Sequence, residues 1–231
     1  MIMKFAISYS GGKDSALAMY RMIKDGHTPV ALISTMNTEQ QRTWFHGIRK
    51  DLLEAVSGSL DIPLIACECV PDEYAQAFES SLMKARDMGA TACVFGDIDI
   101  EDHRQWDKER CDNAGLDCIF PLWKQSREAL VRETIEAGFK ALIKIVQSDK
   151  LGESFLGKDL TLQLIESIIQ TGSDACGENG EYHTFVYDGP TFREPITIEY
   201  GGIVDLGTHK AIDILLKLID TSFVLGYHGN S

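Results

Sequence analysis

Positive charge is scarce in this sequence. Its 231 residues contain 22 Lys and Arg against 35 Asp and Glu, which gives a formal net charge of −13 at pH 7. Proteins that bind nucleic acid broadly hold its phosphate backbone with clusters of Lys and Arg. We therefore expect no nucleic-acid partner, although a local basic cleft for a tRNA remains compatible with this composition. Any site for an anionic ligand must gather its few positive groups locally.

Paired cysteines and long apolar runs are also missing. None of the six cysteines forms a C-x-x-C pair, so a zinc ribbon is excluded, and reduced, buried thiols are expected. No apolar run reaches the roughly 18–20 residues that a membrane span needs, and the chain does not open with a signal-peptide pattern. The expected location is the cytoplasm, without a membrane partner.

The first half alternates apolar segments of strand length with segments of helical periodicity. Near-continuous apolar strands of this kind are typical of a parallel sheet covered by helices on both faces. The expected fold class is therefore α/β, with a doubly wound, mostly parallel sheet. The strands are expected at 3–9, 28–36, 62–67, 91–96 and 117–120, and the helices at 16–23, 47–56, 74–88 and 104–114.

Pro121 ends this alternation, and the pattern after it is mixed. We predict a nucleotide-binding domain over residues 1–123 and a smaller α+β domain over 124–231. The second domain is expected to contain helices at 126–137 and 160–171, a strand at 141–146, a glycine-bearing segment at 152–158 and a β-rich tail from His183.

The sequence SGGKDS, residues 10–15, stands where the first strand ends and the first helix begins. Two glycines allow a tight turn and a close approach to a ligand. The helix start offers N–H groups and a positive dipole end, Lys13 adds a charge, and two serines add hydroxyl donors. The pattern predicts a nucleotide-phosphate site. The alternative is a glycine turn with a Ser or Asp N-cap, which is common at helix starts.

SGGKDS lacks the longer glycine spacing of a Walker A loop and the spread glycines of the dinucleotide fingerprint. It resembles instead the PP-loop of the ATP pyrophosphatases, which split ATP into AMP and pyrophosphate while they activate a substrate as its adenylate.

A second polar segment, GENGEYHT, covers residues 177–184. Two carboxylates, an imidazole and a hydroxyl lie within a loop broken by glycines. Carboxylates bind Mg²⁺ or a substrate ammonium, and an imidazole relays protons near neutral pH. The alternative is a solvated acidic turn.

Together the two motifs resemble the diphthine–ammonia ligase family, which is also described as a PP-loop ATP-binding family. Further matches are His46-Gly47, the segment FGDI at 95–98 and the loop FLGK at 155–158. The resemblance extends from Lys4 to about Phe192. It implies a HUP-type nucleotide domain, a family-specific substrate domain and a cleft between them.

The resemblance also implies a reaction, an ATP-dependent amidation. A carboxylate is adenylated, pyrophosphate leaves, and ammonia attacks the acyl adenylate; in eukaryotic and archaeal members the acceptor is diphthine. This chain has His183 where those ligases carry a carboxylate, and in this it resembles bacterial members. The resemblance therefore implies the ATP chemistry for this chain more strongly than it implies diphthine as the acceptor. We expect the acceptor to be a small-molecule or protein-borne carboxylate. No glutaminase signature is present, so free ammonia is the simpler nitrogen source.

Candidate roles follow from these motifs. Catalytic roles are predicted for Lys13, Asp14, Glu178, Glu181 and His183, and ATP binding for Ser10, Gly11, Gly12, Lys13, Asp14, Ser15, Ser34, Thr35, Met36, Gly96 and Asp97. Substrate binding is predicted for His46, Lys158, Asn179, Gly180 and Thr184. Asp14 is the candidate Mg²⁺ ligand, and its alternative role is that of a helix-dipole partner.

Two other functions stay open at this point. A tRNA-modifying PP-loop enzyme would be expected to show a basic surface or paired cysteines, and a non-catalytic ATP-binding protein of the HUP class would not need the GENGEYHT chemistry. A homodimer is the default oligomeric state.

Overall fold

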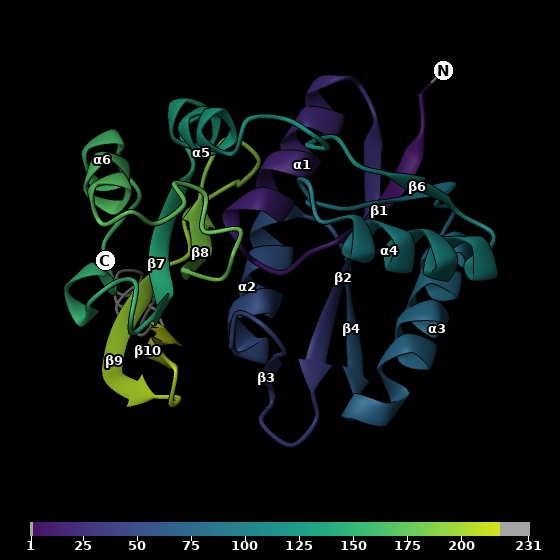
Figure 1. Cartoon of the computed structure of the whole chain (residues 1–231). Coiled ribbons are helices and arrows are strands. Elements are labelled where there is room, and N and C mark those ends of the chain that lie inside the picture. Colours follow the sequence, from purple (N-terminus) through teal and green to yellow (C-terminus); the bar gives the residue numbers. More distant parts are fainter. Residues whose placement is uncertain (1, 218–231) are drawn as a thin grey trace, which may run out of the picture.

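The structure, a computed structural model, describes residues 2–217. Two sheets lie side by side, and helices fill the space between them and cover their outer faces (Figure 1). The tail of the expected second domain, residues 218–231, lies outside the described residues.

Sheet A belongs to the first half of the chain and is mostly parallel. Strand β4 pairs with β2, and β2, β1, β5 and β6 follow in that order; the short β3 runs antiparallel to β2. The strands are β1 (Lys4–Ser8), β2 (Thr28–Asn37), β3 (Arg42–Thr43), β4 (Leu64–Cys69), β5 (Ala92–Val94) and β6 (Asp117–Ile119).

Helices cover both faces of sheet A, as the apolar pattern predicts. On the outer face, Phe78, Leu82 and Ala85 of α3 recur at helical spacing and are buried in one apolar cluster. On the inner face, Leu52 and Val56 of α2 belong to a second cluster that also contains α1. The helices are α1 (Lys13–Lys24) and α2 (Lys50–Leu60) inside, and α3 (Tyr74–Asp87) and α4 (Glu101–Ala114) outside.

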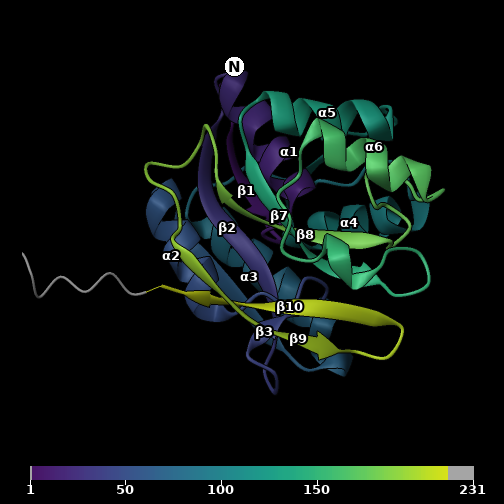
Figure 2. The ribbon, with the colours of Figure 1, turned by 90° about the vertical axis from the view of Figure 1, so that its left-hand side faces the viewer.

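Sheet B is antiparallel, with the order β8-β7-β10-β9. Helices α5 and α6 lie beside β7, while β9 and β10 extend away from them (Figure 2). The elements of this part are α5 (Arg127–Glu136), β7 (Lys140–Gln147), α6 (Leu162–Gln170), β8 (Tyr182–Asp188), β9 (Ile198–Asp205) and β10 (His209–Leu216). Short 3₁₀ turns lie at Pro71–Glu73, before α3, and at Glu153–Phe155, before α6.

The expected fold class, a parallel α/β sheet followed by a smaller α+β part, is confirmed. The boundary at 123/124 stays a prediction. It falls between β6 and α5, but one apolar cluster runs through both parts, from Phe5 of β1 to Ile168 of α6.

One predicted helix begins later than expected. Residues 42–49 form a small hairpin instead, in which the Thr43 N–H donates to the Ile48 carbonyl at 2.8 Å and the Ile48 N–H donates to the Thr43 hydroxyl at 3.0 Å. Gly47 has a left-handed φ of 58°. Helix α2 therefore begins only at Lys50, and the hairpin holds His46 beside sheet B.

Candidate active site

A cavity of about 580 Å³ opens at the carboxyl ends of the parallel strands. Ligands of open α/β sheets bind at this edge, and the volume lies within the usual range of small-molecule sites. The loops after β1 and β5 reach it, as do strand β2, the hairpin at 42–49, the loop before β8 and β8 itself. Its lining includes Ser10, Lys13, Asp14, Ser15, Thr35, His46, Gly96, Asp97, Glu178, His183 and Thr184.

The glycine loop before α1 is tightly built. Gly11 has a φ of +81°, and a Cβ there would stand 2.5 Å from Cδ1 of Ile48. The Gly12 N–H donates to the Ser10 hydroxyl at 3.2 Å, and the Ser15 hydroxyl donates to the Gly12 carbonyl at 3.0 Å. The loop therefore uses some of its own polar groups to hold its shape.

Lys13 places an ammonium group at the wall of the cavity. The residue is 4% exposed, and its Nζ lies 2.7 Å from Oδ2 of Asp14 and 5.5 Å from the centre of the Tyr182 ring. Burial is the largest single influence and would lower the pKa of Lys13, but the Asp14 carboxylate and the other groups around the ammonium together raise the pKa well above its ordinary value. Lys13 is thus a permanent positive charge.

The GENGEYHT segment packs directly on the glycine loop. The Lys13 N–H donates to the Thr184 hydroxyl at 3.0 Å, and the Val186 N–H donates to the Gly11 carbonyl at 2.8 Å. The Cys176 thiol donates to Oδ1 of Asp14 at 3.6 Å. Two motifs separated by about 160 residues in the sequence therefore form one site.

The two glutamates of this segment have different surroundings. Glu178 lines the cavity, and burial together with the nearby Asp14 raises its pKa to about 7. Glu181 is buried outside the cavity lining and accepts hydrogen bonds from the backbone N–H groups of Asp174 and Asn179 at 3.2 and 3.1 Å. Glu178 therefore faces the cavity, while Glu181 fixes the loop that carries it.

Two imidazoles stand at the end of the cavity next to sheet B. The rings of His46 and His183 lie 4.8 Å apart. Burial lowers the pKa of His46 to about 4 and that of His183 to about 3, so both are neutral at pH 7. Nδ1 of His46 lies 3.0 Å from the Thr184 carbonyl, which only accepts, so Nδ1 carries the proton and Nε2 keeps its lone pair.

The loop after β5 closes on the start of α1. A Cβ on Gly96 would stand 2.8 Å from backbone atoms of Asp14 and Ser15, which only glycine permits. The next residue, Asp97, pairs with His103 at 3.3 Å and raises the pKa of that imidazole. Glycine here allows two ligand-facing loops to touch.

The structure does not bring every predicted residue to the cavity. The Ser34 hydroxyl donates to the Tyr9 carbonyl at 2.5 Å, and Met36 is buried in the inner core, so both side chains turn away. Gly11, Gly12, Asn179, Gly180 and Glu181 shape the loops around the cavity without lining it. Lys158 lies in a loop beside β7, where its backbone carbonyl accepts from the Ile143 N–H, and it is also absent from the lining.

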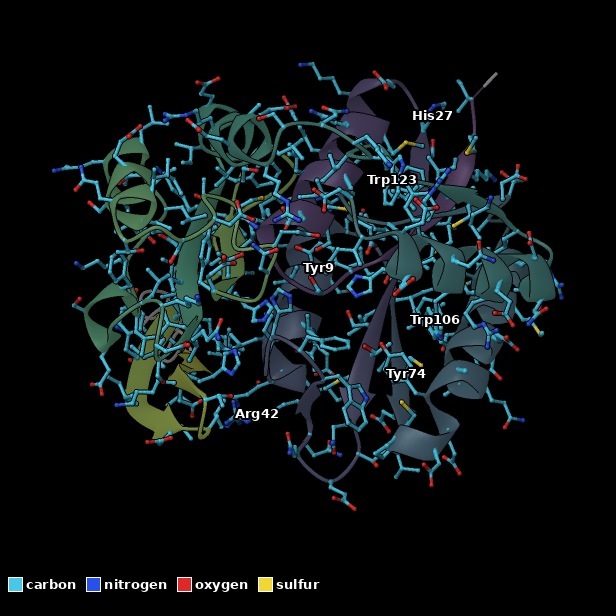
Figure 3. All side chains as sticks on the ribbon, in the orientation of Figure 1. Tyr9, His27, Arg42, Tyr74, Trp106 and Trp123 are labelled. Atoms are coloured by element: carbon cyan, nitrogen blue, oxygen red, sulfur yellow. The ribbon has the colours of Figure 1, made fainter. Side chains whose placement is uncertain are left out.

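Sequence reasoning missed several lining residues. Trp106 is not among the predicted site residues, yet it forms part of the cavity wall with Tyr74, both labelled in Figure 3. Asp107 was not singled out, because a carboxylate on a charged helix is usually solvated. A spacing signal did exist: Tyr74 and Phe78 share one face of α3. Their meeting with α4 depends on tertiary packing.

The carboxylates of the lining fit a magnesium ion that a nucleotide would bring with it. Within residues 2–217, no group of three or more His, Cys, Asp or Glu could hold a metal alone. Mg²⁺ bound to a nucleotide needs only one or two carboxylates, because phosphates and waters supply the other ligands. Asp14 and Asp97 both line the cavity and fit this requirement.

A parallel α/β domain with a glycine loop and lysine at its ligand edge, closed by a second sheet, defines a nucleotide-binding enzyme of PP-loop type. Two family models match it: the diphthamide synthase N-terminal domain over residues 3–118 and the diphthamide synthase C-terminal domain over residues 126–214. The chain belongs to the diphthamide synthase family.

Curated relatives carry the same assignment. The chain is 28% identical to a diphthine–ammonia ligase of Homo sapiens, with 87% of this chain and 85% of that protein covered. It is 27% identical to the Danio rerio ligase, with 82% and 84% covered. The match to the Saccharomyces cerevisiae ligase is 25% identical and covers 83% of this chain but 34% of that longer protein. All three relatives are named as ligases, which supports an enzyme.

Two solved structures also resemble the chain. One is a predicted subunit of tRNA methyltransferase from Methanocaldococcus jannaschii, with 17% identity, a TM-score of 0.44, and 81% of this chain and 98% of that chain covered. The other is a U34-tRNA thiolase from Methanococcus maripaludis, with 17% identity, a TM-score of 0.36, and 58% of this chain and 57% of that chain covered.

Among the described helices, none is long and apolar enough to cross a membrane.

Proposed function

We propose that this protein is an AMP- and pyrophosphate-forming amide ligase that activates a carboxylate with ATP and transfers it to ammonia. The observation that carries the proposal is that residues of SGGKDS and of GENGEYHT line the same cavity. Lys13, which suits a phosphate, and Glu178, which suits an amine, line one cavity and are held there by direct contacts between β8 and the glycine loop.

The first half-reaction takes place beside the glycine loop. The hydroxyls of Ser10 and Ser15 and the ammonium of Lys13 bind the triphosphate, and Lys13 stabilises the charge that develops on the departing pyrophosphate. Asp14 and Asp97 would hold the Mg²⁺ that accompanies ATP and shields its phosphates. The acceptor carboxylate oxygen forms the bond to the α-phosphorus as the bond to pyrophosphate breaks.

The acceptor occupies the end of the cavity beside sheet B. Two neutral imidazoles, His46 and His183, offer hydrogen bonds there without adding charge. The buried Lys144 lies behind them, and its ammonium contributes to lowering the pKa of His46. An anionic carboxylate is therefore drawn toward Lys13 and Lys144.

The second half-reaction needs a base, because ammonia is mostly ammonium at neutral pH. Glu178 meets this need: it lines the cavity, and its pKa of about 7 lets it take a proton at physiological pH. The freed ammonia attacks the acyl carbon, and AMP leaves with the former carboxylate oxygen. His183 is close enough to the acceptor end to orient the carbonyl.

The acceptor is proposed to be a carboxylate other than diphthine, on a small molecule or on a protein. This rests on His183, which stands where the resemblance to the ligases leads us to expect a carboxylate. The cytoplasmic location, the homodimer and free ammonia as nitrogen source stay predictions.

The deciding experiment incubates the protein with Mg-ATP, ammonium and a panel of cellular carboxylates and separates the nucleotides formed. We expect acceptor-dependent AMP and pyrophosphate in equal amounts. Lys13→Ala should abolish turnover, while Lys24→Ala, at the exposed far end of the same helix, should not. Formation of ADP and phosphate, or full turnover by Lys13→Ala, would contradict the proposal.

A further inference from the structure

One arginine joins two loops of the cavity wall from outside the cavity. Arg127 is the first residue of α5, which the chain reaches as it crosses from β6 of sheet A to the side of sheet B (Figure 1). A cation is disfavoured at the N-terminus of a helix, because the helix dipole is positive there. The partners of the Arg127 side chain must offset this cost.

The first partner of Arg127 is the carboxylate of Asp99. Nε of Arg127 donates to Oδ2 of Asp99 at 2.8 Å, and Nη2 donates to Oδ1 at 2.7 Å. Two parallel hydrogen bonds of this kind fix the orientation of both side chains. Asp99 belongs to the loop after β5, in which Gly96 and Asp97 line the cavity. One side of the guanidinium is therefore fixed to this loop.

The remaining nitrogen of the guanidinium reaches the loop that carries Glu178. Nη1 of Arg127 donates to Oδ2 of Asp174 at 2.8 Å and to Oδ1 of Asn179 at 3.1 Å. The same Oδ2 of Asp174 accepts the backbone N–H of Glu178 at 3.1 Å. Arg127 therefore holds the chain on both sides of Glu178, through Asp174 before it and Asn179 after it.

Neither Arg127 nor any of these three partners lines the cavity, so the guanidinium acts through the loops that it holds. The loop after β5 is itself fixed to the glycine loop, because Gly96 packs against the backbone at the start of α1. The contact of Thr184 with Lys13 holds β8, whereas Arg127 holds the loop that precedes β8. The place of Glu178 relative to the glycine loop is therefore set in part through Arg127.

We propose that Arg127 is a positioning residue that couples AMP formation to amide formation. It holds Glu178 in place relative to the nucleotide loops, so that ammonia reaches the acyl adenylate before water does. Ammonia forms the bond to the acyl carbon, the bond to AMP breaks, and the amide results; water at the same carbon returns the free carboxylate and AMP. In either case the proton of the attacking molecule passes to solvent. The inference rests on the proposed function and adds to it a residue outside the cavity.

The test measures the amide formed per AMP by the full chain with Mg-ATP, ¹⁵N-ammonium and the panel of carboxylates described above. Chromatography measures AMP, and mass spectrometry measures ¹⁵N in amides. We expect a ratio close to one for the wild type and a ratio at least about tenfold lower for Arg127→Gln, since a misplacement of about 1 Å costs a reaction step up to about 100-fold. Arg127→Lys keeps the charge without the paired hydrogen bonds and should lie between. Arg132→Gln, on the same helix and also paired with two glutamates, should keep the wild-type ratio.

The ratio does not depend on how much of a variant is folded, so a loss of stability alone does not produce the expected result. Asp99→Asn tests the same contact from its other side and should lower the ratio as well, and the double variant should be no worse than the more affected single variant. A wild-type ratio in Arg127→Gln or in Asp99→Asn would overturn the inference. A wild-type protein that forms no AMP, or AMP without any ¹⁵N-amide, would instead overturn the proposed function on which it rests.

Discussion

For Glu178→Gln we expect a loss of enzymatic activity together with a higher free energy of unfolding at pH 8. Burial and the charge of Asp14 raise the pKa of Glu178 from an ordinary value of 4.5 to about 7. The folded protein therefore binds this proton more tightly than the unfolded chain does. One pKa unit corresponds to 1.36 kcal/mol, so the rise corresponds to about 3 kcal/mol at most.

The direction of the stability effect follows from proton linkage. Below pH 4.5 the carboxyl is protonated in both states, and its pKa shift has no effect on the free energy of unfolding. As the pH rises toward 7, the unfolded state releases the proton first, and the free energy of unfolding falls by up to about 3 kcal/mol. Glutamine is never ionised, so Glu178→Gln should be more stable than the wild type at pH 8 and close to it at pH 4.5.

Urea unfolding of both proteins at pH 4.5 and pH 8 measures this difference directly. Glu136→Gln, at an exposed position, serves as the control and should match the wild type at both pH values. In parallel, the wild-type rate of ammonia-dependent AMP formation should rise with pH through about 7, and Glu178→Gln should lose most of the rate and this rise. A Glu178→Gln protein that is no more stable than the wild type at pH 8 would refute the assignment of a buried, proton-holding carboxyl.

Three further predictions concern the contacts between the motifs. Thr184→Val leaves the buried Lys13 N–H without its acceptor and should cost about 1–3 kcal/mol of stability in urea unfolding, whereas Thr184→Ser should restore it; equal stability of the valine variant would count against the contact. Gly96→Ala forces a Cβ to within 2.8 Å of backbone and should destabilise by about 1–3 kcal/mol and weaken ATP binding in calorimetry, while Gly58→Ala, with open space around it in a helix, should stabilise by about 0.5–1 kcal/mol. His183→Asn should raise the KM for the acceptor at least several-fold in the AMP assay and leave the Kd for ATP unchanged; a parallel loss of ATP affinity would place His183 at the nucleotide instead.

Local signals were sufficient to predict the fold and the glycine-loop end of the cavity. Runs such as 28–36 are apolar on both faces, which only a strand between two helical layers explains, and SGGKDS combines a left-handed glycine with a helix start. Because the strands are parallel, their carboxyl ends share one edge, and the meeting of Ser10, Thr35 and Gly96 follows from topology alone.

The end of the cavity beside sheet B and the aromatic wall formed by Tyr74, Phe78 and Trp106 depend on packing that no local pattern encodes. Glu178 and Glu181 are three residues apart in one polar loop, and only the burial of Glu181 under backbone N–H groups shows that it holds the loop. Trp106 and Asp107 lie on a strongly charged helix whose buried side is set by its packing on α3. Lys144 lies in the apolar strand β7, and only the fold brings the carboxylate of Asp213 from β10 close enough to favour its charge.

The electrostatic division of the cavity explains why a neutral imidazole at position 183 matters. The rim near α4 is acidic, with Asp97, and Glu178 beside it has its pKa raised partly by that charge. Lys13 is paired with Asp14 and acts on both Glu178 and His183, and burial keeps the two imidazoles beside sheet B uncharged. A carboxylate at position 183 would oppose Lys13 with a negative charge and repel an anionic acceptor, whereas His183 preserves the positive potential there. In the proposed reaction the acceptor carboxylate attacks the α-phosphorus first, and the ammonia freed by Glu178 then attacks the acyl carbon of the adenylate.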